Sequence, residues 1–401
     1  MTTSILHRTR LSAGIAISIL SLLAAAEGKV LNGVDVLVES GFEQLDGLKV
    51  GLITNHTGLS RKGKPTIDLL HEAPNVELKA LFGPEHGIRG ELDQAEIKDG
   101  RDDKTGLPVY SLYGASRKPS AEHLKGLDAL VFDIQDIGCR FYTYISTMSL
   151  AMQAAEENGL RFIVLDRVNP IGGVVVDGPV KTAEKKFTSP HQIAIQHGMT
   201  VGELARMFND EKDIGVELEV IQVANWKRAM RFDKTGLKWV NPSPNMRSLE
   251  AAILYPGIGL LEFTELSVGR GTKTPFEHIG APYIDGQQLQ KMLDDQKLPG
   301  VRFKATSYTP DASVFEGKAC EGVSFKITDR DSIRPIDTGL LVAKYLTRTK
   351  DGYDIDDFNV LLNHPATLAA VKAQKSNDEI RELWADELAD FRKRRANFLL
   401  Y

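Results

Sequence analysis

Between Gly28 and about Pro242, short apolar runs alternate with stretches of helical pattern, and this alternation constrains the fold more than any other feature. The expected strands are 49–54, 76–82, 107–112, 129–134 and 161–165, and the expected helices are 63–72, 119–125 and 141–158. Apolar runs separated by helices are typical of βαβ units, in which a mostly parallel sheet is covered on both faces. The pattern therefore predicts an α/β fold for the first half of the chain.

The chain has 401 residues, which exceeds the size at which single cores usually stop growing, so two domains are expected. The segment Asn241-Pro242-Ser243-Pro244-Asn245 is rigid and extended because each proline restricts its own φ and the residue before it. We place the boundary there, with a catalytic domain over 27–245 and a smaller α+β domain over 246–401 that closes the cleft. The second domain is expected to contain a strand at 323–328 and helices at 337–348 and 378–398, the last with an apolar stripe at Ile380, Leu383, Trp384, Leu388 and Phe391.

The N-terminus has the form of a secretory signal peptide over residues 1–26. His7, Arg8 and Arg10 precede an apolar run that ends in three alanines, and small residues of this kind are typical of a cleavage site. The run is shorter than the about 20 residues that span a bilayer. We expect an exported protein, periplasmic or extracellular, without stable membrane insertion of the mature chain. An uncleaved anchor and a buried N-terminal helix are the alternatives.

Charge and cysteine content exclude two classes of function. The formal net charge is −5, from 49 basic and 54 acidic residues, and a general nucleic-acid binder needs a basic face. Cys139 and Cys320 lie far apart without a CxxC spacing, which excludes a structural zinc site built on thiolates. A single disulfide and two buried thiols both remain open for this pair.

Polar residues follow each expected strand of the first domain. Because ligands bind outside the carboxyl ends of the strands in an open α/β sheet, we expect these residues to gather at one site. They are Asn55 and His56, then Glu85 and His86, then Tyr113, then Gln135 and Asp136, and finally Asp166, Arg167 and Asn169.

The turn Gly83-Pro84-Glu85-His86-Gly87 presents a carboxylate and an imidazole directly after a strand. Glycine permits backbone geometry that other residues avoid, so such a turn can aim its side chains. Glu is a common general acid because modest burial raises its pKa toward the working pH. The alternative is that Glu85 and His86 only brace the turn.

Two further segments carry charged groups suited to a sugar substrate. In 133–144, Asp136, Arg140 and Tyr142 occur at a strand-to-helix junction, where Arg and Tyr suit a sugar carboxylate and hydroxyls. The alternative there is helix capping with a salt bridge. Arg270 lies between two glycines on a loop expected to be exposed and flexible, and Glu262 before it is a candidate second carboxylate.

Several enzyme classes lack their motifs. The chain has no Walker A sequence, no GxGxxG after the first strand, no GxSxG nucleophile elbow and no HExxH helix. A metal held by His56, His86 and Asp136 is a weaker alternative, which would correspond to an amidase or esterase.

From about Val34 to Tyr401 the chain resembles the NamZ-type exo-β-N-acetylmuramidases, a glycoside hydrolase family formerly catalogued as a domain of unknown function. The resemblance is carried by GLITNHTG at 51–58, FGPEHGIRG at 82–90, TGLPVYSLYG at 105–114, DIQDIGCRFYTY at 133–144, LDRVNPIGG at 165–173, HGMTVGELA at 197–205, PSPNM at 242–246, and SVGRGT with PFEHIGAP within 267–282. It implies release of N-acetylmuramic acid from the non-reducing ends of peptidoglycan glycans. It also implies a Rossmann-like N-terminal domain, a smaller C-terminal domain and an active site in the cleft between them.

The resemblance implies Glu85 as the catalytic acid and no metal or organic cofactor. The second catalytic group is left open between Glu262, Asp136 and an acetamido oxygen of the substrate. Because muramic acid carries a lactyl carboxylate, an arginine is expected in the cleft, and Arg89, Arg140 and Arg270 are the candidates. The full set of expected substrate-binding residues is Asn55, His56, His86, Arg89, Arg140, Tyr142, Asn169, Asn245 and Arg270.

The chain departs from the family pattern at two places. Where the family often reads E-G-T-N, this chain has Glu262-Phe263-Thr264-Glu265, and Val168 replaces a usual proline. These changes leave the substrate preference less defined than the fold. A catalytically silent glycan-binding protein would keep the aromatic and arginine residues, whereas the retained Glu85 favours an enzyme.

Overall fold

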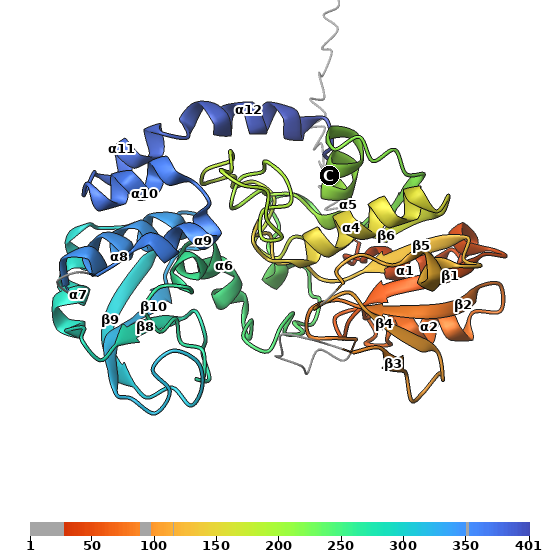
Figure 1. Ribbon diagram of the computed structural model, residues 1–401, viewed down its shortest axis with the longest axis horizontal. Helices are drawn as coiled ribbons and strands as arrows, with labels where there is room; N and C mark the ends of the chain where they lie inside the picture. The colour runs from red at the N-terminus through yellow and green to blue at the C-terminus, as the bar shows by residue number, and fades with distance from the viewer. Residues whose placement is uncertain (1–27, 89–97, 115, 350–352) are drawn as a thin grey trace, which may run out of the picture.

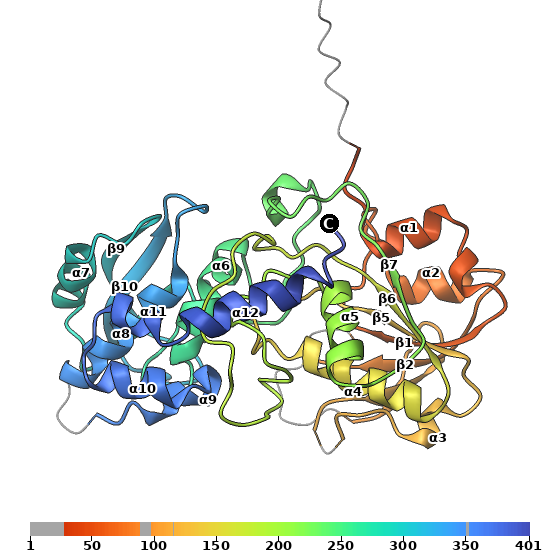
Figure 2. The same ribbon diagram turned by 90° about the horizontal axis from the view of Figure 1, so that it is seen from above.

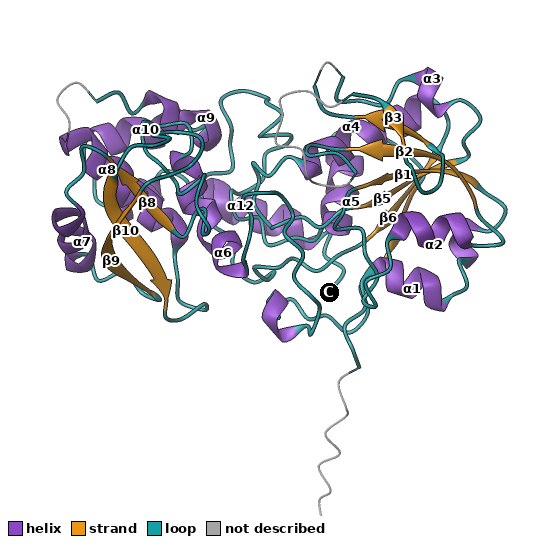
Figure 3. Ribbon diagram, turned by 90° about the horizontal axis from the view of Figure 1, so that it is seen from below, coloured by secondary structure: helices purple, strands orange, loops and turns teal. Residues whose placement is uncertain are grey.

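The computed structural model describes residues 28–88, 98–114, 116–349 and 353–401. The expected signal peptide and Arg89 lie outside these ranges. Figure 1 shows two lobes, and Figure 3 shows that each contains one sheet, with loops and a few helices between them. In the described ranges, no helix combines the length and the apolar character needed to cross a bilayer.

The N-terminal lobe is built on a seven-stranded sheet. Its strands are β1 (Lys49–Thr54), β2 (Glu77–Gly83), β3 (Gly100–Arg101), β4 (Pro108–Ser111), β5 (Ala129–Asp133), β6 (Arg161–Leu165) and β7 (Leu218–Ile221). Their order is β3-β4-β2-β1-β5-β6-β7, and all pairs are parallel except β3 with β4. Without β3, this is the strand order of the Rossmann fold, with the reversal between β1 and β5. The predicted α/β class is confirmed.

Helices cover both faces of this sheet (Figure 2). On one face α1 (Gly33–Glu39) and α2 (Thr66–Glu72) pack on side chains such as Leu52 and Val131. On the other face α4 (Tyr144–Glu157) and α5 (Val201–Glu211) pack on Phe132 and its neighbours. Because successive strand residues point to opposite faces, a strand buried on both faces must be apolar at every position, as β5 is through Ala129–Phe132. The short α3 (Ala121–Leu124) precedes β5.

The C-terminal lobe contains a three-stranded antiparallel sheet in the order β8-β10-β9, with strands β8 (His278–Ala281), β9 (Val301–Tyr308) and β10 (Cys320–Ile327). Helix α7 (Gly286–Asp295) packs on β9 and β10. The other helices of this lobe are α6 (Leu249–Ile258), α8 (Pro335–Thr349), α9 (Asn359–Leu362) and α10 (Pro365–Lys372). Helices α6 and α8 approach closely because Gly339 has no side chain. A Cβ at this position would lie 2.4 Å from the carbonyl oxygen of Gly257. Short 3-10 helices are η1 (Glu43–Leu45), η2 (Phe232–Lys234), η3 (Gly259–Leu261) and η4 (Asp356–Phe358).

The single helix expected at 378–398 is wrong, because the structure has two helices there, α11 (Asn377–Glu382) and α12 (Ala385–Ala396). The chain turns at Leu383 and Trp384. The turn buries Trp384 to 1% exposure and leaves Leu383 40% exposed, so Leu383 does not belong to the predicted apolar stripe. After the turn, α12 crosses back to the N-terminal lobe, where the C-terminus lies beside α5 (Figures 1 and 2).

Candidate active site

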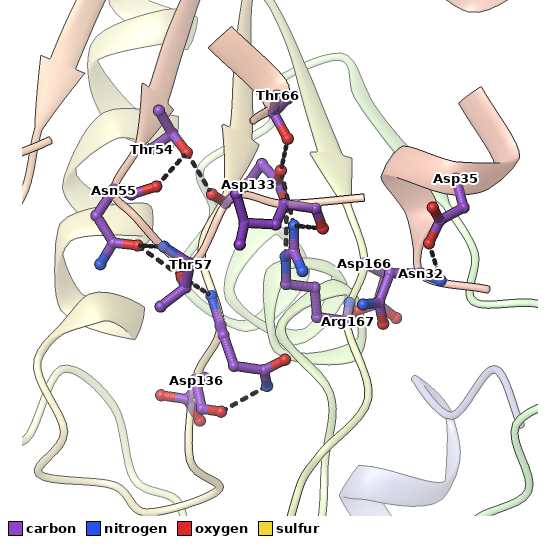
Figure 4. Close-up of polar contacts among 12 residues, drawn as sticks. Asn32, Asp35, Thr54, Asn55, Thr57, Thr66, Asp133, Asp136, Asp166 and Arg167 are labelled. Atoms are coloured by element: carbon purple, nitrogen blue, oxygen red, sulfur yellow. Dashed lines mark hydrogen bonds and ion pairs between the residues drawn. The ribbon is translucent and has the colours of Figure 1, made fainter. Parts of the chain in front are cut away.

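The end of β5 holds a buried ion pair rather than a free carboxylate. Asp133 is fully buried, and Arg167 donates to both of its oxygens, from Nε at 2.6 Å and from Nη2 at 2.9 Å. The hydroxyl of Thr66 donates to the same carboxylate, as Figure 4 shows. This part of the strand-end cluster braces the edge of the sheet.

Three of the predicted binding residues, Asn55, His56 and Asn169, also brace this edge of the sheet. Asn55 Oδ1 accepts the backbone N–H of Thr57 at 2.9 Å and the hydroxyl of the same residue (Figure 4). His56 Nε2 lies 2.6 Å from the carbonyl oxygen of Asn241, and Asn169 donates to the carbonyl of Met199 at 3.0 Å. These contacts fix the loops after β1 and β6.

Asp136 is a buried carboxyl behind the pocket. Its Oδ2 accepts the N–H of Gly138 at 2.7 Å and lies 3.9 Å from Nε2 of His197. Burial raises the pKa of Asp136 to about 7 and lowers the pKa of His197 to about 3. Asp136 is absent from the pocket lining.

Arg140 is fully buried, and its guanidinium is surrounded by backbone carbonyls. It donates to Pro179 at 2.8 Å, Ile193 at 3.3 Å, Leu361 at 3.2 Å and Leu362 at 2.7 Å. Burial lowers the pKa of Arg140 to about 10, which leaves it charged at neutral pH. The structure thus places this expected carboxylate binder between chain segments instead of in the pocket.

A pocket of about 270 Å³ lies where the two lobes meet, at the carboxyl ends of β2, β4 and β5. Of the predicted site residues, it brings together Glu85, His86, Tyr113, Tyr142, Glu262 and Arg270. Asn245 is buried between lining residues Ser243 and Met246 but does not line the pocket. The remaining lining residues are Arg117, Phe141, Thr143, Tyr144, Phe187, Thr188, Tyr255, Phe263, Phe276 and Leu361.

Glu85 is aimed by the tight turn that follows β2. The N–H of Gly87 donates to the carbonyl of Pro84 at 2.9 Å, and His86 has a φ of 71°, in the left-handed region that non-glycine residues avoid. Such backbone strain persists only where the surroundings enforce it, and it clusters at functional sites. The hydroxyl of Thr143, at the start of α4, donates to Glu85 Oε2.

Glu262 faces the pocket from the C-terminal lobe and forms an ion pair with Arg270. Glu262 directly follows η3, and the Arg270 guanidinium lies 5.8 Å from the ring centroid of Phe276. The side chain of Arg270 is 30% exposed. The expectation of a freely exposed cation on this loop is therefore wrong, because Glu262 and Phe276 hold it.

Sequence reasoning missed Arg117, a second arginine of the pocket. Its guanidinium lies 4.2 Å from the ring centroid of Phe187 and 5.9 Å from that of Tyr113. Within the described ranges, no carboxylate pairs with it. Arg117 comes soon after Tyr113, so extending the strand-end rule a few residues along the loop after β4 would have found it.

The inner wall of the pocket consists of buried aromatic rings. Tyr255 packs edge-on against Tyr142, with centroids 6.0 Å apart, and against Phe276 at 4.8 Å. Burial raises the pKa of both tyrosines above the ordinary phenol value, so they remain neutral hydrogen-bond donors. Aromatic walls with a few polar groups are typical of a small-molecule site.

Comparisons with known proteins agree with this arrangement of two lobes. The family models described as "Exo-beta-N-acetylmuramidase NamZ", N-terminal and C-terminal, match residues 50–250 and 253–401. The chain belongs to the NamZ family. It is 44% identical over 386 residues to the peptidoglycan β-N-acetylmuramidase NamZ of Bacillus subtilis (strain 168), covering 94% of this chain and 92% of the relative.

The NamZ fold is also shared by two solved DUF1343-family proteins of Bacteroides fragilis. One has a TM-score of 0.86 at 39% identity, and the other has a TM-score of 0.78 at 31% identity. Both alignments cover 93% of this chain and 99% of the solved chain. The described molecule as a whole therefore shares the fold of these solved proteins, and the strand order of the seven-stranded sheet confirms the Rossmann-like expectation for the N-terminal lobe.

The two departures from the NamZ pattern have different positions. Val168 is buried, and its N–H donates to Asn32 Oδ1 at 3.4 Å, a contact that proline has no N–H to make. Phe263, in contrast, lines the pocket and is 52% exposed. The departure at Phe263 therefore alters the site itself.

Within the described ranges, no three His, Cys, Asp or Glu side chains form a group suited to a metal ion. His56, His86 and Asp136 thus do not come together as a ligand set. Cys139 and Cys320 are both buried and unpaired, which settles the choice between a disulfide and two thiols.

Proposed function

We propose that this NamZ-family chain is an exo-acting glycoside hydrolase that releases N-acetylmuramic acid from the non-reducing ends of peptidoglycan glycans. The observation that carries the proposal is that two carboxyl groups, Glu85 from one lobe and Glu262 from the other, line one aromatic pocket. A pair of carboxyl groups flanking the scissile bond is the usual machinery of glycoside hydrolysis. The name of the Bacillus subtilis relative supports the same substrate.

In this proposal Glu85 is the general acid. Thr143 holds one oxygen of its carboxyl group, so the other can meet the glycosidic oxygen and protonate it as the bond breaks. Glu262 is the second group: as the acidic partner of Arg270 it offers a carboxylate to the developing oxocarbenium ion or to the attacking water. Asp136 is the weaker candidate because it lies outside the lining.

We assign recognition of the lactyl carboxylate to Arg117. Arg270 is already engaged with Glu262, whereas Arg117 stacks on Phe187 without a paired carboxylate among the described residues. A guanidinium recognises a carboxylate through two parallel N–H donors. His86 and the neutral phenol of Tyr142 are proposed to contact sugar hydroxyls or the acetamido group.

We further propose that residues 1–26 export the chain and that the mature protein acts in the periplasm or outside the cell, in cell-wall recycling. The support is the basic and then apolar N-terminus with its terminal alanines. Detection of a mature chain beginning near residue 27 in the exported fraction would support export, whereas a full-length chain retained in the cytoplasm would contradict it.

The test uses residues 27–401 and para-nitrophenyl β-glycosides of N-acetylmuramic acid and N-acetylglucosamine. Wild type should release N-acetylmuramic acid, and Glu85→Gln should lower kcat by about a hundredfold or more while substrate binding persists. Glu250→Gln is the matched control because Glu250 pairs with Arg330 away from the pocket. Binding without turnover by wild type would instead indicate a silent glycan-binding protein, and loss of turnover on chelation would indicate a metal-dependent hydrolase.

A further inference from the structure

Phe263 lines the pocket, and its aromatic side chain is exposed to solvent. It is 52% exposed, and the other large exposed hydrophobic side chains among the described residues, Val38, Val174 and Leu383, are aliphatic and do not line the pocket. An exposed ring forgoes the stabilisation that burial of apolar surface gives, so the fold gains little from it. Its position points to a role in ligand contact.

The backbone around Phe263 is held firmly. Leu261, Thr264 and Leu266 are buried on either side of it. The N–H of Thr264 donates to the carbonyl of Leu261 at 3.0 Å, and the Thr264 hydroxyl donates to the same carbonyl at 2.7 Å. The ring therefore projects from a fixed turn, and a pre-organised contact spends less free energy on ordering when a ligand binds.

Phe263 also differs in exposure from the aromatic residues that form the inner wall of the pocket. Phe141, Tyr142, Tyr255 and Phe276 are buried and form the inner wall, whereas the exposed ring of Phe263 lies at the mouth. An exo-acting enzyme encloses the terminal sugar, and the remaining glycan must leave through the mouth. Phe263 directly follows Glu262, and it lines the same pocket as Glu262 and Glu85, the carboxyl groups proposed to flank the scissile bond.

We propose that Phe263 is a stacking platform for the first sugar of the leaving glycan. This inference rests on the proposed function, since it assigns the residue that binds the sugar on the far side of the cleaved bond. The C–H groups on one face of a pyranose form an apolar surface that packs on an aromatic ring, while the hydroxyls at its edge remain in water. The ligand class is a neutral N-acetylhexosamine at the reducing side of the terminal muramic acid.

The test compares two substrates that share the terminal sugar. One is the disaccharide of N-acetylmuramic acid β-linked to N-acetylglucosamine, and the other is the methyl β-glycoside of N-acetylmuramic acid. Phe263→Ala should lower kcat/KM for the disaccharide by about tenfold, which corresponds to about 1.4 kcal/mol, and leave the methyl glycoside within about twofold. Phe263→Trp should retain the activity on the disaccharide because it keeps an aromatic face.

Leu383→Ala is the control, since it removes an exposed apolar side chain away from the pocket and should change neither substrate. Equal losses on both substrates in Phe263→Ala, or no loss on either, would overturn the platform while leaving the proposed function intact. If wild type hydrolyses neither substrate, the proposed function fails and the platform fails with it.

Discussion

Replacing Arg167 with methionine should destabilise the N-terminal lobe strongly. Arg167 is buried and supplies two hydrogen bonds, at 2.6 and 2.9 Å, to the fully buried Asp133 (Figure 4). Without it, the carboxylate keeps the hydroxyl of Thr66 but loses its compensating charge. Breaking a buried pair from one side costs about 3–5 kcal/mol because an uncompensated charge remains. At about 2–4 °C per kcal/mol for a domain of this size, we expect Tm to fall by about 10 °C.

The assay is urea denaturation followed by circular dichroism, with Arg167→Met, Asp133→Asn and the double variant. The double variant should recover much of the loss because its neutral amide no longer needs a cation, which gives a coupling energy above about 1.5 kcal/mol. Arg161→Met is the control, since Arg161 pairs with Glu217 and Glu219 at the surface, where such pairs contribute under about 1 kcal/mol. A loss in Arg167→Met no larger than that in Arg161→Met, or single losses that simply add in the double variant, would contradict a coupled buried pair.

Asp136, Arg117 and Tyr401 each have a contact or a burial whose contribution can be measured. Burial raises the pKa of Asp136 from 3.8 to about 7, so wild type loses stability as pH rises from about 4 to about 7, whereas Asp136→Asn does not titrate. The variant should therefore gain up to about 4 kcal/mol on wild type across that window, and a difference in unfolding free energy that stays flat with pH would contradict this. Arg117→Gln should lower the preference for N-acetylmuramic acid over N-acetylglucosamine glycosides by about tenfold, as expected for one charge-assisted contact, and an unchanged kcat/KM ratio would move carboxylate recognition elsewhere. Tyr401→Phe removes a hydroxyl that donates to Asp166 at 2.7 Å and accepts the N–H of Val223 at 2.8 Å. It should lower the free energy of unfolding, measured by urea denaturation, by about 1–3 kcal/mol. An unchanged free energy of unfolding would show that these two hydrogen bonds do not stabilise the C-terminus.

The strands buried on both faces were the most predictable elements. The bounds of β1 and β6 agree with the expected strands 49–54 and 161–165, because each is an apolar run that ends at polar residues. The break between α11 and α12 was not predictable from spacing. The stripe through Ile380 and Leu388 continues across the break, whereas the burial of Trp384 in the core at the turn is a tertiary feature that spacing does not report.

The position of the candidate site at one edge of the sheet could be predicted from the sequence, but the side chains that line its pocket could not. The strand-end rule brings Glu85 to this edge of the sheet, and extending the rule along the loops after β4 and β5 adds Arg117 and Arg140. The rule does not say which of these side chains points into a cavity. Arg140 points inward because carbonyls 221 and 222 positions further along the chain, at Leu361 and Leu362, are there to accept its N–H groups. The residues next to Arg140 in the sequence do not indicate these distant acceptors. Sequence alone therefore cannot distinguish a buried arginine from an arginine that lines a pocket.

The hydrogen bonds that hold Arg140 outside the pocket also connect chain segments that shape the pocket. Arg140 ties Pro179 and Ile193 to the α9 segment that supplies the lining residue Leu361. Arg381 joins Asp177 to Asp337 at 2.7 and 2.6 Å, and the guanidinium of Arg395 donates to carbonyls of the N-terminal half. Glu85 and Glu262 come from different lobes, so these cross-connections and the apolar core that the two lobes share fix their separation. Because stabilisation of a developing charge depends on groups already held in place, Arg140, Arg381 and Arg395 serve the proposed chemistry by holding the two carboxyl groups in position.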